Sequence, residues 1–242
     1  MRKAMLIGIA AAAMAAAACG QNRAEDGGPT VQRNYQVGAF ERIEVAGPYE
    51  VEVRTGGEPG VSASGPEKLI ERLVVEVRGD RLLIHPRREN GSRWFNWGSR
   101  GTARVQVTAP ALPAATIAGS GEIRIDRVEG ASFEGSVAGS GDLDVGALEV
   151  ETLKLSVAGS GDVRAGSGQS RSAEYSIAGS GDINAGGVRS ETAAVSIAGS
   201  GTIHGHATGT ADVTIMGSGD VVLTGGAKCK VSKSGSGDVR CS

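Results

Sequence analysis

Aromatic residues and cysteine are scarce in this chain of 242 residues. Phe, Trp and Tyr together make up 3% of the sequence, so a core built around large rings is excluded. Glycine, in contrast, occurs 39 times. We therefore expect stability to come from many small aliphatic side chains that stack closely on one another.

An excess of basic charge is also missing. The chain has 25 Lys and Arg against 27 Asp and Glu, which leaves a net charge of −2. Proteins that bind nucleic acids depend on clustered Lys and Arg, so we expect no nucleic-acid partner. The sequence also contains no His-Glu-x-x-His motif, no phosphate-binding loop and no Ser-His-Asp ordering. We therefore expect neither enzyme activity nor a cofactor.

Long uncharged apolar runs are missing too, except at the N-terminus. Two basic residues and a short apolar run there are typical of a secretory signal peptide, which we place at residues 1–18. Cys19 directly follows Ala16-Ala17-Ala18, an arrangement similar to the lipobox of bacterial lipoproteins, in which this cysteine carries lipid. We expect an outer-membrane lipoprotein of the cell envelope, with residues 19–30 as a polar tether. The alternative is ordinary cleavage, which would leave a periplasmic or secreted protein.

What the chain does have is a repeat. The triplet Gly-Ser-Gly starts at residues 119, 139, 159, 179, 199, 217 and 235. Aliphatic residues stand two before and four after the first glycine, as at Val157 and Val163. These even offsets place them on one face of a strand. A fixed period of this length is typical of stacked repeats.

The repeat predicts an all-β fold. We expect a parallel β-helix, or β-solenoid, of about seven coils of 18–20 residues over residues 113–242. Each coil should run as a strand, a Gly-Ser-Gly bend, a second strand and a looser third side that carries glycine and charge. The glycines should allow the sharp bend, where a Cβ would clash.

Residues 31–112 show a different pattern. Apolar and charged residues alternate with a period of two, as at Val51 and Val53 or at Leu82 and Ile84. This alternation is typical of half-buried strands. Only residues 67–73 have the spacing of a helix. We therefore predict a strand-rich N-terminal cap.

A pattern of apolar residues and one glycine precedes the repeats. It reads Phe40-x-x-Ile43-x-Val45-x-Gly47-x-x-x-Val51-x-Val53. Together with the following Gly-Ser-Gly-Asp coils, it resembles the head GIN domain family of putative auto-transporter adhesins, over about residues 40–242. The resemblance implies a β-helix-like fold in an exported, often lipid-anchored bacterial protein. It brings no catalytic residues with it.

The position after each triplet is mostly acidic. Its residues are Glu122, Asp142, Asp162, Asp182, Thr202, Asp220 and Asp238. In a stack of coils these side chains form a row, and each can accept backbone N–H groups in the glycine-rich bend. The alternative is a Ca²⁺ site, with Asp142, Asp162 and Asp182 as ligands. We expect the N–H interaction.

Cys229 and Cys241 stand six residues before and six residues after the start of the last triplet. Both offsets are even, so both side chains should point into the last coil. We predict a disulfide that closes this end of the column; the alternative is a pair of buried free thiols.

An aromatic segment lies between two predicted strands. Its candidate ligand-binding residues are Arg93, Trp94, Phe95, Trp97 and Arg100. Aromatic rings stack on sugars and settle at membrane surfaces, so the segment could bind a glycan or a membrane. The alternative is a lid over the apolar first coil.

These features predict a non-catalytic surface or periplasmic module, adhesin-like, with a binding or structural role. Its partners would be a membrane, reached through the lipid anchor at Cys19, and a glycan or a surface protein. The alternative is a polysaccharide lyase or hydrolase, because parallel β-helices host such enzymes.

Overall fold

A computed structural model describes residues 28–87 and 102–242. Its elements are β1 (Thr30–Tyr35), β2 (Arg42–Ala46), β3 (Tyr49–Thr55), β4 (Gly60–Pro66), α1 (Glu67–Arg72), β5 (Leu73–Arg78), β6 (Arg81–Pro86), β7 (Ala103–Ala109), β8 (Ala114–Gly119), β9 (Glu122–Gly139), β10 (Asp142–Gly159), β11 (Asp162–Gly179), β12 (Ile183–Gly199), β13 (Thr202–Gly217), β14 (Asp220–Thr224), β15 (Lys228–Gly235) and β16 (Val239–Cys241). The predicted all-β fold is confirmed.

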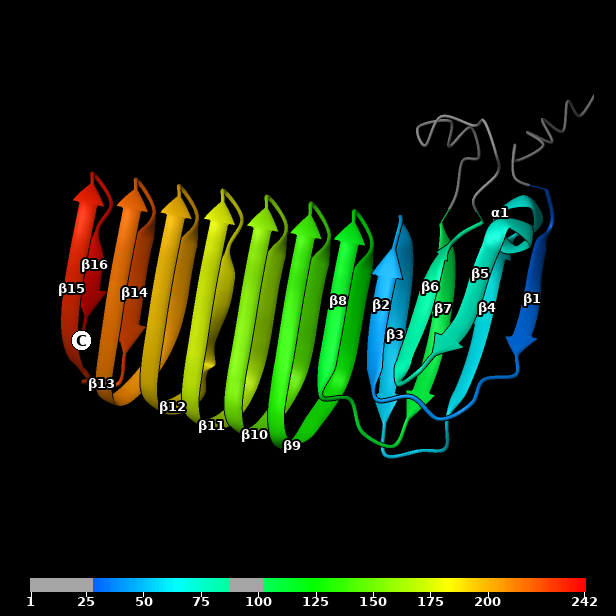
Figure 1. Ribbon diagram of the computed structural model, residues 1–242, viewed down its shortest axis with the longest axis horizontal. Helices are drawn as coiled ribbons and strands as arrows, with labels where there is room; N and C mark the ends of the chain where they lie inside the picture. Colours follow the sequence, from blue (N-terminus) through cyan, green and yellow to red (C-terminus); the bar gives the residue numbers. More distant parts are fainter. Residues whose placement is uncertain (1–27, 88–101) are drawn as a thin grey trace, which may run out of the picture.

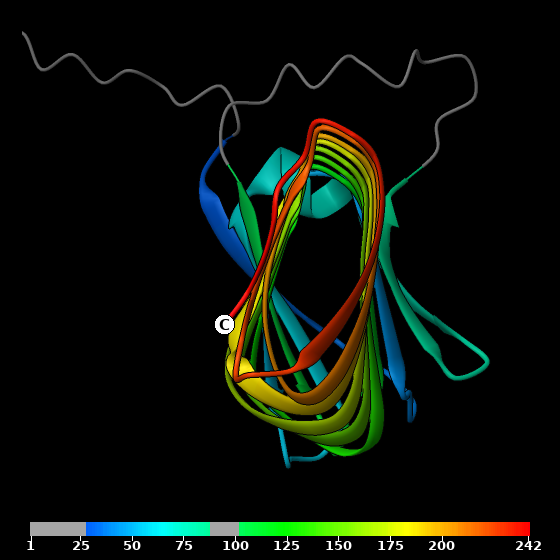
Figure 2. The same ribbon diagram turned by 90° about the vertical axis from the view of Figure 1, so that its left-hand side faces the viewer.

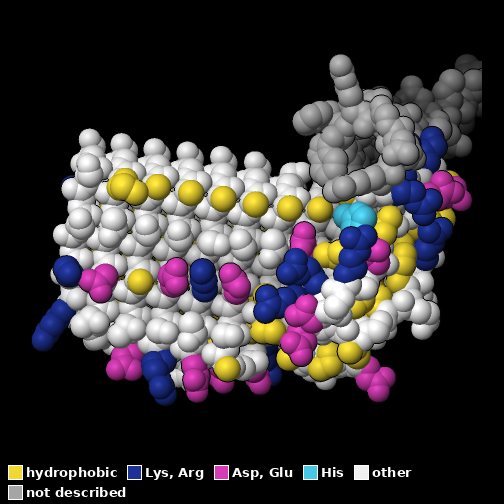
Figure 3. Space-filling model, in the orientation of Figure 1, with side chains coloured by type: hydrophobic (Ala, Val, Ile, Leu, Met, Phe, Trp, Pro, Cys, Tyr) yellow, Lys and Arg dark blue, Asp and Glu magenta, His cyan; other side chains and the backbone are white. Residues whose placement is uncertain are grey.

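Strands β9 to β13 form successive coils of a column (Figure 1). Each coil pairs in parallel with the next, so that residues 142–159 lie in register with residues 162–179. The column has about six turns, close to the seven predicted, and the parallel β-solenoid is confirmed. Along the column, side chains of one kind form rows, as Figure 3 shows.

The coils are flattened rings with two long sides (Figure 2). The prediction of a looser third side is wrong, because β10 and β11 stay paired there, from Leu148 and Gly168 to Val150 and Ser170. The shortening of the repeat from 20 to 18 residues is absorbed opposite the Gly-Ser-Gly corner. The register between β12 and β13 shifts there, between Asn184 and Thr192.

The interior of the column is a stack of aliphatic side chains. The residue four after each corner glycine is fully buried in six successive coils: Ile123, Leu143, Val163, Ile183, Ile203 and Val221. Each such side chain stabilises the fold by roughly 1.5–3 kcal/mol. The large number of small buried groups replaces the aromatic core that this composition excludes.

The Gly-Ser-Gly triplets form the corners at one end of the flattened ring. Gly139 has φ +129°, and a Cβ there would overlap the carbonyl oxygen of Gly119 in the previous coil. Ser140 donates its backbone N–H to that same oxygen at 2.9 Å. Glycine is thus required because the backbones of neighbouring coils touch at the corner.

The stacking continues into the N-terminal region that we predicted as a cap. Strand β2 pairs in parallel with β8, and β3 pairs in parallel with β9. Between β2 and β3, Gly47 has φ +112° and takes the place of a corner glycine. Beyond this coil, β7, β4 and β1 extend one sheet, and β6 and β5 extend the other. Helix α1 confirms the helix indicated by the spacing of residues 67–73, and its Leu69 and Ile70 are buried.

The last coil is closed by the predicted disulfide. Cys229 in β15 is bonded to Cys241 in β16, with Cα atoms 6.6 Å apart. Cys229 packs against the core, whereas Cys241 is exposed, because the last coil has a neighbour on one side only within the described chain. Lys233 stands at the inner position of this coil, paired with Ile215, and its Nζ donates to the carbonyl oxygen of Gly237 at 2.6 Å.

Several predictions concern residues that are not described. Cys19, the signal peptide of residues 1–18 and most of the tether lie outside the described residues, so they remain predictions. Within residues 28–87 and 102–242, no helix is long and apolar enough to cross a membrane.

Candidate functional site

The aromatic segment predicted as a binding site cannot be placed. Its residues Arg93, Trp94, Phe95, Trp97 and Arg100 lie outside the described residues. Both interpretations of this segment, ligand binding and lid, therefore remain predictions.

The acidic row binds backbone N–H groups, as expected, but of the next coil. Asp162 Oδ1 accepts the N–H of Asp182 at 3.2 Å, and Asp182 Oδ1 accepts the N–H of Thr202 at 2.8 Å. Asp220 does the same for Asp238 at 2.8 Å. The donor is in the next coil because the stacking places it one rung beyond each carboxylate. The row therefore links coils in addition to the strand pairing.

The same row shows no arrangement for a metal ion in the described part of the chain. No group of three or more His, Cys, Asp or Glu side chains there could hold one. Both oxygens of Asp162 are engaged, since Oδ2 lies 3.3 Å from Nη2 of Arg164. Arg124 likewise forms an ion pair with Glu122. These arginines offset the repulsion between stacked carboxylates.

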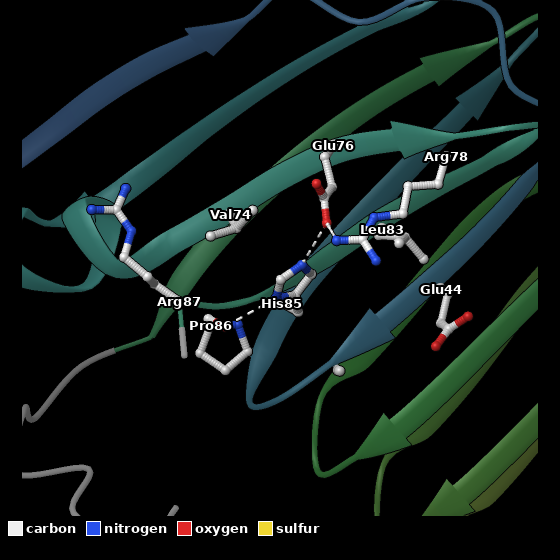
Figure 4. Close-up of a pocket in the computed structure, with 9 residues that line it drawn as sticks. Glu44, Val74, Glu76, Arg78, Leu83, His85, Pro86 and Arg87 are labelled. Carbon is white, nitrogen blue, oxygen red and sulfur yellow. Dashed lines mark hydrogen bonds and ion pairs between the residues drawn. The ribbon is translucent and has the colours of Figure 1, made fainter. Parts of the chain in front are cut away.

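A hollow of about 510 Å³ lies where β2, β5 and β6 meet (Figure 4). It is lined by Glu44, Ala46, Val74, Glu76, Arg78, Leu83, His85, Pro86 and Arg87. The volume is within the usual range for small-molecule sites. This hollow brings together carboxylate, guanidinium, imidazole and apolar side chains.

A β-hairpin forms one wall of the hollow. Strands β5 and β6 pair antiparallel, with Gly79 at φ +66° in the turn between them. Strand β6 also pairs in parallel with β2, so that Leu83 lies beside Glu44. Figure 2 shows that the hairpin stands out from the column on the same side as β2. The hollow occupies the angle between the hairpin and the column.

His85 is held by two oxygen acceptors. Its Nε2 lies 3.1 Å from Oε1 of Glu76, and its Nδ1 lies 2.9 Å from the carbonyl oxygen of Pro86. These two contacts fix the orientation of the imidazole ring beside Glu76.

Glu76 is the anionic partner in this contact. The hydrogen bond from His85 lowers the pKa of the Glu76 carboxyl below its usual value, and the charge of Arg78 lowers it further. Arg78 Nη2 lies 2.7 Å from Oε1 of Glu76. The lowered pKa keeps the carboxylate ionised at neutral pH, and the side chains of His85 and Arg78 orient it.

The rest of the hollow combines charge with apolar surface. Glu44 Oε2 accepts from Nη1 of Arg81 at 3.0 Å, so this second carboxylate is also held in place. Val74, Leu83 and Pro86 supply the apolar surface, and Arg87 supplies another guanidinium. The arrangement can donate and accept hydrogen bonds beside a non-polar wall.

Sequence reasoning did not find this site. The available signal was the alternation of Val74, Glu76 and Arg78, which puts all three side chains on one face of β5. A hairpin centred on Gly79 and Asp80 then brings Glu76 close to His85.

Comparison with known proteins adds the family. A family model described as "Putative auto-transporter adhesin, head GIN domain" matches residues 39–227. The chain belongs to this family. The resemblance inferred from the sequence is therefore confirmed. Among curated proteins, none matches this head GIN domain chain.

Solved structures share the fold of this head GIN domain. A crystal structure described as a "putative adhesin" from Bacteroides fragilis has 22% sequence identity and a TM-score of 0.78, and the match covers 88% of this chain and 97% of that chain. A "putative lipid binding protein" from Parabacteroides distasonis has 26% identity and a TM-score of 0.70, covering 89% and 97%. A "putative adhesin" from Parabacteroides merdae has 19% identity and a TM-score of 0.70, covering 89% and 97%. The family and the two adhesins are described as adhesins and not as enzymes.

Proposed function

We propose that this head GIN domain protein is a non-catalytic, adhesin-like binding module of the cell envelope, and that its hollow binds a neutral sugar residue of a glycan. The observation that supports this most directly is the hollow itself. It places the oriented carboxylates of Glu44 and Glu76 and the guanidinium of Arg78 around apolar side chains.

Sugars suit this combination of groups. Each hydroxyl both donates and accepts hydrogen bonds, so carboxylates and guanidinium groups can serve the same ring. The C–H face of a sugar ring can pack on Val74, Leu83 and Pro86. The carboxylates of Glu44 and Glu76 stand against the guanidinium groups of Arg78 and Arg87, so neither sign of charge dominates. This balance favours a neutral, hydroxyl-rich ligand.

The lipid anchor at Cys19 belongs to the same proposal. A tether of about 11 residues, from Cys19 to the start of β1 at Thr30, reaches at most roughly 40 Å. The hollow lies in the N-terminal region that follows this tether. An anchored molecule would therefore hold the hollow near the membrane, and glycans of the envelope are the first ligands to test.

Binding is tested on an array of envelope glycans, with the exported chain kept in solution by Cys19→Ser. We expect Glu76→Gln and Arg78→Ala each to lower retention by about tenfold, the effect of one lost charged hydrogen bond. Glu149→Gln, on the far turn of β10, is the matched control. Unchanged retention in both hollow variants, with unchanged melting, would refute the proposal.

Additional arms separate the remaining alternatives. Phospholipid vesicles in the same assay test a lipid ligand, the class named for the relative from P. distasonis. Trp94→Ala and Trp97→Ala should lower retention without lowering the melting temperature if the aromatic segment binds ligand. A lower melting temperature would instead assign that segment to the lid. Runs with and without Ca²⁺ test the metal alternative.

A further inference from the structure

One long side of the column is an exposed face of small side chains, here called the front face. It consists of the outward side chains of β8, β15 and the second halves of β9 to β13 (Figures 1 and 3). An alanine row crosses it in register and ends in a methionine: Ala118, Ala138, Ala158, Ala178, Ala198 and Met216. A row of serine and threonine runs beside it: Ser136, Ser156, Ser176, Ser196 and Thr214.

A third row on the front face carries charge. From β9 to β15 it reads Glu134, Lys154, Glu174, Ala194, Asp212 and Lys230. All six residues are exposed, and Figure 3 shows the row as acidic and basic side chains with one hydrophobic side chain between two acidic ones. Within one copy, Lys154 Nζ lies 3.9 Å from Oε1 of Glu174.

The order of charges in this row is complementary to its own reverse. From Glu134 to Lys230 the charges are minus, plus, minus, neutral, minus and plus. From Lys230 to Glu134 they are plus, minus, neutral, minus, plus and minus. An antiparallel copy therefore places opposite charges at four of the six positions. A parallel copy places like charges on one another at every charged position.

We propose that a second copy of this chain packs against the front face, antiparallel, about a two-fold axis that runs along the strands between β11 and β12. Glu134 then faces Lys230 of the second copy, and Lys154 faces Asp212 of the second copy. The two-fold axis repeats both pairs, as an isologous interface requires.

The other rows also fit this arrangement. The alanine row faces itself, so that Ala178 lies opposite Ala198 of the second copy. Met216, a residue that is 57% exposed, lies opposite Ala158 of the second copy. Small side chains on both faces let the two sheets approach to about 10 Å, the usual distance between packed sheets.

The area is that of a stable dimer. Six rungs spaced about 4.8 Å apart and about eight residues per strand give a face of roughly 29 by 26 Å. Both copies together would bury about 1,500 Å², within the standard range for specific interfaces.

The hairpin of β5 and β6 excludes the parallel alternative. It stands forward of the column on the side of the front face (Figure 2). In a parallel pair the two hairpins would collide. In the antiparallel pair, each hairpin lies beyond the C-terminal end of the other column. The hollow then remains open, so this inference does not depend on the proposed function.

The test is sedimentation of the exported Cys19→Ser chain over a range of concentrations. We expect a dimer that weakens between about 0.05 and 0.5 M salt, because exposed ion pairs are screened. Lys154→Glu and Asp212→Lys should each weaken the dimer about tenfold or more, since each places like charges opposite one another. The double variant should restore it. Asp144→Lys, on the opposite long side, is the control.

Three results would overturn the proposal. The first is a monomer at every concentration in low salt. The second is a dimer that neither single variant weakens. The third is a double variant in which dimerisation is not restored. A monomer whose glycan retention falls with Lys154→Glu would assign the front face to a glycan instead.

Discussion

Asp182 accepts, at Oδ1, the backbone N–H of Thr202 at 2.8 Å, one coil further along the column. The same relationship joins Asp162 to Asp182 and Asp220 to Asp238. A row of like charges would by itself destabilise the stack. Because each of these carboxylates satisfies a donor in the next coil, the row contributes to the cohesion of the column.

Replacing Asp182 tests this contribution. Asp182→Ala should lower the free energy of unfolding by about 0.5–2 kcal/mol, as for the loss of a helix N-cap, because the N–H of Thr202 loses its acceptor. Asp182→Asn keeps an acceptor oxygen and should cost less. Thr202→Ala leaves the donor in the backbone and serves as the control. Equal free energies of urea unfolding for all three variants would show that the hydrogen bond from Thr202 to Asp182 contributes nothing to stability.

The corner glycines should not tolerate a side chain. Gly159 has φ +132°, and a Cβ would overlap the carbonyl oxygen of Gly139. Gly159→Ala should therefore destabilise the protein by roughly 2–4 kcal/mol, from backbone strain and overpacking. Ser160→Ala, at the exposed tip of the same corner, should change stability by less than about 0.5 kcal/mol. Thermal melts of the two variants measure the difference, and similar values would contradict the required role of glycine.

The disulfide should stabilise the last coil locally. Changing both Cys229 and Cys241 to Ser should remove about 2–4 kcal/mol from the stability of residues 225–242. The earlier coils should change little, because each coil contacts only its neighbours. Hydrogen exchange read peptide by peptide measures this. Unchanged protection in the last coil would mean that stacking on β13 and β14 suffices without the bridge.

Tyr175 should make the protein sensitive to alkali. Its ring is buried in the column; burial raises the pKa of Tyr175 to about 12, and the hydroxyl of Ser190 opposes part of the rise. The folded state therefore keeps its proton above pH 10, where the unfolded chain loses it. This contribution is complete below about pH 10 and is lost as the pH rises towards 12, about 2–3 kcal/mol in all.

Tyr175→Phe isolates this effect. Urea unfolding at about pH 8 and pH 11 should show a smaller loss of stability for the variant than for the parent chain, since phenylalanine does not titrate. Other groups titrate equally in both proteins, so the comparison removes them. Parallel losses in the two proteins would show that the buried phenol does not contribute.

Much of the fold followed from local patterns. The even offsets of Val157 and Val163 from the corner glycine predicted that both point inward, and both are buried. The same parity predicted the bridge between Cys229 and Cys241. Successive side chains of an extended chain point to opposite faces, so the face of each residue can be counted from the sequence. The two-sided coil was not predicted, because it depends on how closely opposite sheets approach.

The candidate site was less accessible to such counting. Glu76 and His85 come from two strands of a hairpin, and the spacing of residues does not give the angle at which the hairpin leaves the column. That angle forms the hollow. The charged row from Glu134 to Lys230 could be listed from the repeat, but its exposure could not.

The period of the glycines and the alternation of aliphatic residues were sufficient to establish a stacked β-column, because both act within one coil and on its nearest neighbour. The three-dimensional structure was needed to show where the column begins, how its hairpin stands away and which long side stays uncovered. These features depend on contacts between residues far apart in the chain, where sheets end or meet. The spacing of residues within one coil does not determine such contacts.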